Sequence, residues 1–251
     1  VTRRWPDEVE KRLTETFDVE LNRDDRPLST TELKQAFSTA DAVFPTVTDA
    51  INAEVLSAEP MRARLIGNYG VGFNNIDIAA AKKAGLVVTN TPGVLTDATA
   101  DIALTLLLNV ARRTHEGETM LRAGEWTGWR PTQLMGTSPQ GKVLGIIGMG
   151  RIGKAMAKRC HHALEMEIVF YDAFPVPDAG VPAKQLGSVD EVLQAADFVS
   201  LHCPGGGDNV HLINARRLKL MKRSAFLVNS ARGDIVDEAA LVEALAAGTI
   251  A

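Results

Sequence analysis

Apolar and polar positions alternate along the chain in blocks that are typical of strands and helices in succession. In the first ninety residues, short apolar runs predict strands at 1–5, 18–21, 42–45, 64–67 and 86–89. Stretches with helical spacing lie between them, at 31–39 and 76–84. Gly85 follows the second stretch, at a position where a glycine commonly ends a helix. This order predicts βαβ units around a parallel sheet.

A second block with the same alternation begins at Lys142. It predicts strands at 142–148, 167–171, 198–202 and 225–229, and helices at 152–163 and 238–247. Ser188 and Glu191 have the spacing of a capping box, so we expect another helix to begin there. The last residues, 249–251, fall where the alternation predicts a further strand. The whole pattern is that of an α/β protein.

A long helix is predicted between the two blocks, at 97–113. Its apolar residues cover much of its circumference: Ala98, Ile102, Ala103, Leu106, Leu107 and Val110. A helix of this kind must be covered on several sides, and burial in the core or contact with a second subunit would both achieve this. A loop with glycines and tryptophans follows at 124–141.

Composition and charge exclude several classes of protein. The 251 residues carry a net charge of −4 and are 45% hydrophobic, as in ordinary globular chains. The acidic balance argues against a nucleic-acid partner, and no apolar run reaches the roughly 18 residues of a membrane span. The N-terminus lacks the apolar segment of a signal peptide. Cys160 and Cys203 have no metal-site spacing, so we expect free thiols, no bound metal and a cytoplasmic protein.

The second block opens with a G-x-G-x-x-G run at Gly148, Gly150 and Gly153. The run follows a predicted strand and begins a predicted helix, and Asp172 lies about 20 positions further on, which is the pattern of dinucleotide-binding folds. We expect the first glycine to make a tight turn, the second to admit a pyrophosphate and the third to let helix and strand pack closely. Asp172 would bind the adenosine ribose and repel a 2′-phosphate, which favours NAD over NADP.

Two other segments are candidates for binding a substrate. Gly70 and Gly72 follow a predicted strand and would expose backbone amides beside a helix N-terminus, which can cradle a small carboxylate; an ordinary turn would also explain them. Arg232 comes after a predicted strand of the second block, at the end where ligands of open α/β sheets bind. An arginine in that position can clamp a carboxylate and polarise a carbonyl group.

These segments together resemble the D-isomer-specific 2-hydroxyacid dehydrogenases. The resemblance spans nearly the whole chain, and its order is specific. It is carried by VGFNNID at 71–77, NTPGV at 90–94, GIIGMGRIG at 145–153, HCP at 202–204 and NSARGDIVDE at 229–238. Within the family, LTD at 95–97 and GEWTGWRP at 124–131 resemble the glyoxylate and hydroxypyruvate reductases.

The resemblance implies a fold of two doubly wound parallel-sheet domains. Residues 1–92 would form a flavodoxin-like substrate domain whose C-terminal part is missing from this chain. Residues 93–251 would form the inserted Rossmann NAD-binding domain. The enzyme would be a homodimer, with residues 97–130 at its interface.

The resemblance also implies roles for individual residues. The amides of Val71 and Gly72 would bind the substrate carboxylate. Arg232 would be catalytic and would bind both the carboxylate and the ketone oxygen. Trp129 would reach toward the active site of the partner subunit and contact substrate there. The residues that line the cofactor would be Gly148, Gly150, Arg151, Ile152, Gly153, Asp172, Cys203 and Ser230.

Reduction of a ketone also requires a proton donor. In the family this is a His paired with a Glu, and both lie beyond the point that matches Ala251. We therefore expect the chain to be part of a longer enzyme and to lack this pair. None of the five histidines replaces it: His115, His161 and His162 fit helical or helix-end positions, His211 has no evident partner, and His202 would form a wall of the cofactor site.

The favoured interpretation is an NAD-dependent enzyme that reduces a small 2-oxo acid, such as glyoxylate or hydroxypyruvate, to the D-2-hydroxy acid. One alternative is a non-catalytic, NAD-responsive binding protein of the corepressor type, against which the carboxylate cradle and Arg232 argue. The other is a dehydrogenase of the same family for phosphoglycerate, formate, phosphite or lactate. The sequence does not give the volume of the pocket, and a fold alone does not choose a substrate.

Overall fold

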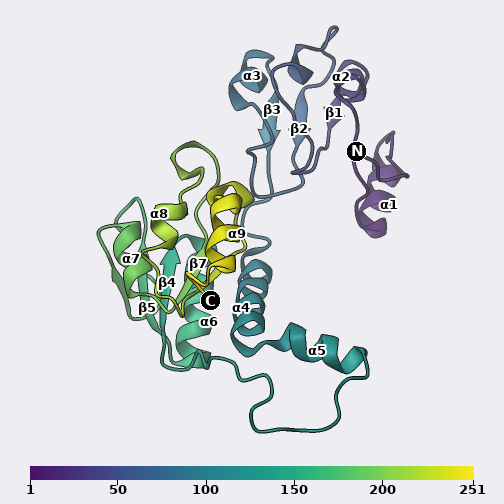
Figure 1. Ribbon diagram of the computed structural model, residues 1–251. Coiled ribbons are helices and arrows are strands. Elements are labelled where there is room, and N and C mark those ends of the chain that lie inside the picture. Colours follow the sequence, from purple (N-terminus) through teal and green to yellow (C-terminus); the bar gives the residue numbers. More distant parts are fainter. The chain divides into compact units, whose positions relative to one another are not determined.

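The structure is a computed structural model that describes residues 1–251. The chain forms two compact units, Val1–Val94 (unit 1) and Leu95–Ala251 (unit 2), which are drawn in Figure 1. Each unit has its own parallel sheet and its own buried core. The boundary that the sequence suggested, after residue 92, lies two residues before this division.

Unit 1 contains a three-stranded parallel sheet in the order β1-β2-β3. The strands are β1 (Ala42–Val43), β2 (Leu65–Gly67) and β3 (Val87–Thr89), and the helices are α1 (Asp7–Thr16), α2 (Thr30–Thr39) and α3 (Ile78–Lys83). Phe37 of α2, Ile66 of β2 and Ala81 of α3 are fully buried in one core. Helix α2 begins with a complete capping box made by Ser29 and Glu32.

The two strands predicted before residue 22 are wrong. Thr2 donates a single backbone hydrogen bond to Phe44 O (3.2 Å), and the amino group of Val1 donates to Glu20 O (2.9 Å). These isolated bonds do not make the regular hydrogen-bond ladder of a β-strand. Pro6, which has no backbone N–H, cannot extend the pairing. Helix α1 lies between the two segments and was not predicted, because Glu10 is its only buried residue and it has no apolar stripe.

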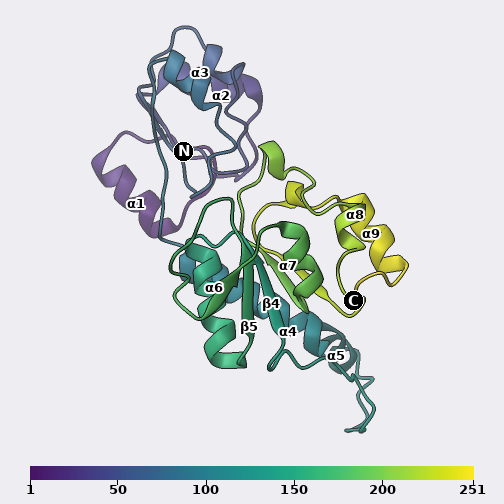
Figure 2. The same ribbon diagram turned by 90° about the vertical axis from the view of Figure 1, so that its left-hand side faces the viewer.

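Unit 2 contains a five-stranded parallel sheet in the order β6-β5-β4-β7-β8. The strands are β4 (Val143–Ile147), β5 (Glu167–Tyr171), β6 (Ala183–Gln185), β7 (Phe198–Leu201) and β8 (Phe226–Asn229). The strand order reverses at β4, and helices cover both faces of the sheet (Figure 2). One core lies between the sheet and helices α4 and α6, and the other lies between the sheet and helices α7, α8 and α9. Unit 2 is therefore a doubly wound Rossmann fold.

Unit 2 has six α-helices, and the sequence predicted all of them except the second and the fifth. They are α4 (Thr96–Arg112), α5 (Thr114–Arg122), α6 (Arg151–Leu164), α7 (Val189–Ala195), α8 (Ala215–Leu218) and α9 (Glu238–Ala246). Ser188 caps α7 by accepting from the Glu191 amide, while the Glu191 carboxylate accepts from Gly187 N rather than from Ser188 N. At 249–251 no strand forms, but the Ala251 amide donates to Ala225 O, beside the start of β8.

Only one face of helix α4 is buried in the core. Ala103 and Leu107 are fully buried against α6 and the sheet. The opposite face carries Ile102, Leu106 and Val110, which remain 57%, 38% and 45% exposed. These three residues are four positions apart and therefore form one apolar stripe.

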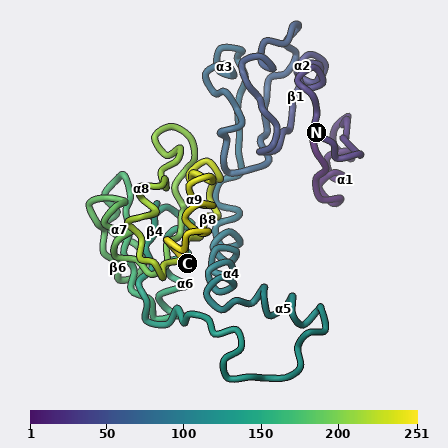
Figure 3. The backbone as a smooth tube through the Cα atoms, viewed as in Figure 1, coloured from purple at the N-terminus to yellow at the C-terminus, as the bar shows by residue number.

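Helix α5 and the loop that follows it form an arm, which the teal tube shows in Figure 3. No residue from 112 to 138 is buried. The arm exposes several large apolar side chains: Leu121, Trp126, Trp129 and Met135. None of the helices in the structure is long and apolar enough to cross a membrane.

Candidate active site

The loop between β4 and α6, residues 148–153 (the glycine loop), needs a glycine at its first position. Gly148 has a φ of +93°, and a Cβ atom there would lie 2.6 Å from Cys203 N. The Gly148 amide donates to Tyr171 O at the end of β5 (2.9 Å). The chain thus turns sharply between β5 and β7, where no larger residue fits.

The other two glycines of this loop differ in their surroundings. A Cβ on Gly153 would lie 2.2 Å from Gly148 O, so α6 packs directly against the loop. A Cβ on Gly150 would meet nothing within 4 Å. No side chain caps α6, which begins with Arg151 and Ile152. Its first-turn amides therefore face open space beside Gly150, an arrangement that suits an anion.

Asp172 follows β5 and holds the glycine loop as well as its own turn. Its Oδ2 accepts from Met149 N (2.9 Å), and its Oδ1 accepts from Phe174 N (3.1 Å). Both carboxylate oxygens are thus oriented by backbone amides, and each keeps a further lone pair for a ligand hydroxyl.

Three side chains after β7 and β8 complete this edge of the sheet. Burial lowers the pKa of His202 to about 4, and its Nε2 lies 2.9 Å from the hydroxyl of the buried Ser200. Burial likewise raises the pKa of Cys203 to about 11. Both groups are therefore neutral near pH 7. The hydroxyl oxygen of Ser230 is buried and has no hydrogen-bond partner.

Arg232 lies in the turn after β8, and hydrogen bonds from a neighbouring residue fix the conformation of this turn. Asn229 holds this turn from both sides, because its Nδ2 donates to Arg232 O (2.7 Å) and its Oδ1 accepts from Ala231 N (3.0 Å). The Arg232 guanidinium donates only to Ala231 O, and no carboxylate lies within ion-pair distance in unit 2. A Cβ on Gly205 would lie 2.9 Å from the Arg232 side chain, so the β7 loop packs closely against it. Arg232 is exposed and retains donors for an anion.

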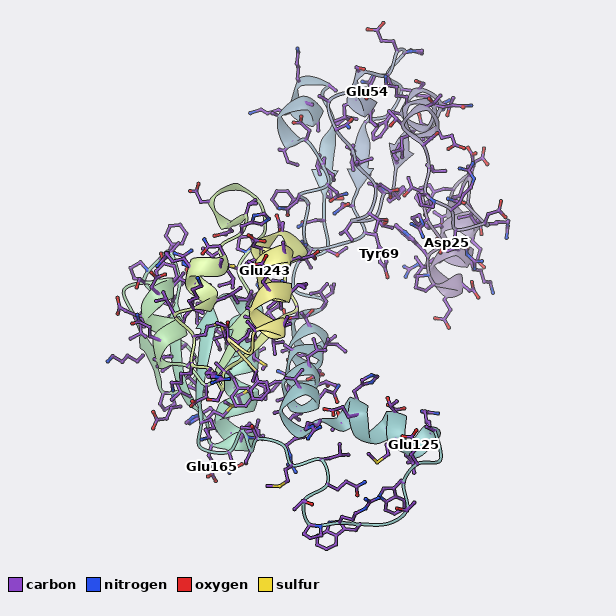
Figure 4. The ribbon with its side chains drawn as sticks, in the orientation of Figure 1. Asp25, Glu54, Tyr69, Glu125, Glu165 and Glu243 are labelled. Atoms are coloured by element: carbon purple, nitrogen blue, oxygen red, sulfur yellow. The ribbon has the colours of Figure 1, made fainter.

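In unit 1, residues 68–77 form a turn after β2 (the amide turn). The amides of Val71 and Gly72 donate to no backbone carbonyl group of the unit, whereas their own carbonyl oxygens accept from Asn90 Nδ2 and Asn68 Nδ2, both at 2.8 Å. Tyr69, labelled in Figure 4, belongs to the same turn and packs against Trp5 with ring centroids 4.9 Å apart.

The amide turn differs from the prediction in one respect. Helix α3 has only six residues, and Asp77 caps it by accepting from Ala80 N (2.9 Å). Asp77 therefore occupies one amide at the start of the helix, and the amides of Val71 and Gly72 in the turn remain open.

Unit 2 thus brings together most of the site residues expected in it. The glycine loop, Asp172, Cys203, Ser230 and Arg232 all follow the carboxyl ends of β4, β5, β7 and β8. Trp129 belongs to the arm and not to this edge of the sheet, and it is 81% exposed. The sequence interpretation missed Asn68, Asn90 and Asn229. An asparagine at or directly after the end of a strand could have drawn attention to all three, and the family segments that begin at Asn90 and Asn229 could have done so for these two.

The residues at the glycine loop fit NAD. The open space at Gly150 and the uncapped N-terminus of α6 suit a pyrophosphate. Asp172 offers acceptors for ribose hydroxyls, and the unpartnered Ser230 hydroxyl can bond to a ligand. No group of His, Cys, Asp or Glu side chains is arranged to hold a metal ion.

Comparison with known proteins identifies the same chemistry. Residues 104–251 match the family described as "D-isomer specific 2-hydroxyacid dehydrogenase, NAD binding domain". A glyoxylate reductase of Thermococcus litoralis is 41% identical over 259 aligned residues, which cover 100% of this chain and 77% of that relative.

Solved structures agree with this match. A protein of Thermus thermophilus is 45% identical with a TM-score of 0.90, covering 98% of this chain and 77% of that one. The D-lactate dehydrogenase of Aquifex aeolicus, solved with NAD and lactic acid, is 27% identical with a TM-score of 0.82, covering 97% and 71%. From its fold, its glycine loop and these similarities, the chain belongs to the D-isomer-specific 2-hydroxyacid dehydrogenases, a family of NAD-dependent oxidoreductases.

Proposed function

We propose that this protein reduces a small 2-oxo acid of the glyoxylate or hydroxypyruvate type to the D-2-hydroxy acid with NADH. The observation that carries the proposal is the pair of open amides at Val71 and Gly72, neither of which donates a hydrogen bond to a backbone carbonyl group. Two adjacent amides offer donors for one carboxylate group, which every 2-oxo acid carries. The similarity to a glyoxylate reductase supports a small substrate. Unit 1 is accordingly the substrate domain and unit 2 the cofactor domain.

The cofactor role rests on the edge of the sheet in unit 2. The amides of Gly150, Arg151 and Ile152 bind the pyrophosphate, and Gly148 and Gly153 hold the loop in the conformation that exposes them. Asp172 accepts hydrogen bonds from the adenosine ribose and repels a 2′-phosphate, so NAD is preferred to NADP. Cys203 and Ser230 line the same site, with the Ser230 hydroxyl as a polar contact.

The protein's own groups bind and polarise a 2-oxo acid. In unit 1, the amides of Val71 and Gly72 bind a carboxylate group. In unit 2, Arg232 binds a carboxylate group and a ketone oxygen. The guanidinium stabilises the negative charge that develops on this oxygen during reduction. The nicotinamide supplies the hydride when NADH is bound. His202 is not the proton donor, because burial keeps it neutral down to about pH 4.

The test is the oxidation of NADH, followed by its absorbance, with glyoxylate, hydroxypyruvate, pyruvate and phosphoglycerate. The full-length protein should turn over the first two. Arg232→Ala should lower kcat/KM by about 100-fold or more, which is the usual effect of losing one donor to the developing oxyanion. Arg12→Ala, at an exposed arginine of α1, is the matched control and should behave as wild type. Absence of NADH oxidation with every small 2-oxo acid would contradict the proposal.

We also propose that the protein is a homodimer. The stripe Ile102, Leu106 and Val110 on α4 and the apolar side chains of the arm form exposed surfaces that a second copy would cover. In such a dimer Trp129 would contact substrate in the partner subunit. Sedimentation equilibrium should give twice the protomer mass, and Leu106→Glu should give the protomer. A wild-type protomer at micromolar concentration would contradict this proposal.

A further inference from the structure

The amide turn owes its shape to the residues that follow β3. Asn90 Nδ2 donates to Val71 O (2.8 Å), and Thr91 N donates to Gly70 O (3.1 Å). The parallel register of Gly67 with Thr89 places Asn90 beside Asn68, whose amide donates to Thr89 O (2.9 Å). Two consecutive residues after β3 thus bind two consecutive carbonyl groups of the turn.

These bonds determine where the open amides point. A peptide group is planar and trans, so the C=O of one residue and the N–H of the next lie in one plane and point in opposite directions. The bond from Thr91 to Gly70 O therefore fixes the direction of the Val71 amide. The bond from Asn90 to Val71 O fixes the direction of the Gly72 amide in the same way.

A second asparagine supports the turn from within the unit. Asn68 is 2% exposed, and its Nδ2 donates to Gly72 O (2.8 Å). Its Oδ1 accepts from Asn75 Nδ2 (3.1 Å), which also donates to Thr46 O (3.0 Å). Because the Oδ1 already has a donor, the Asn68 amide group faces Gly72 with its N–H. The amide turn is thus joined to the segment after β1.

We propose that Asn90 is a positioning residue for the substrate: it holds the Gly72 amide in the direction that binds a carboxylate, with Asn68 supporting the next peptide group. Asn90 acts through the backbone and does not itself touch the substrate. The ligand class is a small monocarboxylate anion with an adjacent carbonyl group. This inference rests on the function proposed above.

The test replaces Asn90 by aspartate, which has nearly the same shape but no N–H to donate. Asn90→Asp should raise the KM for glyoxylate about tenfold, the usual effect of misplacing one hydrogen bond to a charged group, while kcat changes less than about twofold. The dissociation constant of NADH, from fluorescence titration, should stay unchanged. Asn22→Asp is the matched control, since Asn22 Nδ2 donates to Thr2 O and Arg26 O in the same unit. Its KM should equal that of wild type.

A second measurement separates positioning from a loss of folding. In ¹⁵N-labelled wild-type protein with bound NAD, glyoxylate should shift the amide resonances of both Val71 and Gly72. In Asn90→Asp the Gly72 shift should shrink while the Val71 shift persists, because Thr91 still holds the Val71 peptide group. Equal loss of both shifts, or an unchanged KM, would overturn this inference. If wild type neither binds nor reduces glyoxylate, the proposed function itself is wrong.

Discussion

The glycine loop and the amide turn both present open backbone amides, and they hold those amides in opposite ways. In the glycine loop the absence of side chains shapes the site, through a positive φ at Gly148 and the contact of Gly153 with Gly148 O, and Asp172 adds one bond from Met149 N. In the amide turn, asparagine side chains bind the carbonyl groups: Asn68 from within the turn and Asn90 from the segment after β3. Open backbone amides can therefore be exposed in two ways: by glycines, which leave room around the backbone, or by asparagine side chains, which hold the neighbouring carbonyl groups.

This difference has a consequence for mutation. A glycine loop fails when a carbon atom is added, because the added atom meets backbone. An amide turn fails when a donor is removed, because the peptide groups lose their orientation. Substitutions in the two regions should thus separate effects on packing from effects on binding.

The largest effect is expected for Gly153→Ala. Its Cβ would lie 2.2 Å from Gly148 O, which is backbone, so α6 must move away from the loop. We expect the free energy of unfolding to fall by about 3 kcal/mol, as for severe overpacking. Binding of NADH should weaken more than about tenfold, because the loop changes shape. Urea unfolding and fluorescence titration measure both effects, and a variant of unchanged stability would show that the loop tolerates added volume.

The next largest effect is expected for acidification, which should lower the free energy of unfolding through the glycine-loop region and not through the amide turn. The asparagines of the amide turn do not titrate, whereas His202 beside the glycine loop has a pKa lowered to about 4 by burial. Between pH 6.5 and pH 4 the unfolded chain binds a proton that the folded chain does not, so stability present above pH 6.5 is lost as the pH falls. We expect a loss of about 2 kcal/mol at pH 4.5 relative to pH 7.5 from this group.

Urea unfolding of wild type and His202→Gln at the two pH values tests this expectation. The variant should lose about 2 kcal/mol less on acidification than wild type does, because the group with the lowered pKa is gone. An identical acid-induced loss in both proteins would show that other groups cause it.

A smaller effect, on binding alone, is expected for Gly150→Ala. Gly150 has a φ of −76°, which alanine also adopts, and its Cβ would meet nothing within 4 Å. The free energy of unfolding should change by less than about 1 kcal/mol. The affinity for NADH should nevertheless fall about tenfold, because the new methyl group occupies the space of the pyrophosphate. Equal NADH affinity would place the cofactor elsewhere.

The smallest effect is expected for the choice of cofactor. Asp172→Asn removes the charge that would repel a 2′-phosphate, and partly exposed charge interactions contribute up to about 1 kcal/mol, or about fivefold in affinity. The ratio of NADPH to NADH dissociation constants should fall by about this factor. Asp178→Asn is the control, because Asp178 lies in the same loop and accepts only from Gly180 N. An unchanged ratio in Asp172→Asn would assign the preference to other residues.

The two regions also differ in how well sequence reasoning describes them. Gly148, Gly150 and Gly153 are recognisable because each constraint is local: a strand ends, a tight turn follows and a helix begins within a few residues. The spacing from this run also pointed to Asp172, and the structure places its carboxylate on the loop through Met149 N. Strands β4 and β7 were predicted well because they are largely buried and apolar. Strand β5 was predicted as well, although only Ile168 and Phe170 of its five residues are buried.

The support of the amide turn was not foreseeable in this way. Asn68 and Asn90 are far apart in the sequence and meet only because β2 and β3 pair in parallel register. Helices α1 and α5 were missed for a different reason. They bury almost nothing, so no apolar periodicity marks them, and the acidic first turn of α1 after Pro6 is the one signal that could have shown it.

The arm also has a bearing on the lifetime of the protein. From 112 to 138 no side chain is buried, so a protease can bind this run of chain without first unfolding the sheet. A second copy that covers the apolar stripe of α4 and the arm would block that access. Cellular turnover would then remove protomers that have not found a partner and spare those that have, so that the abundance of the protein follows its assembly.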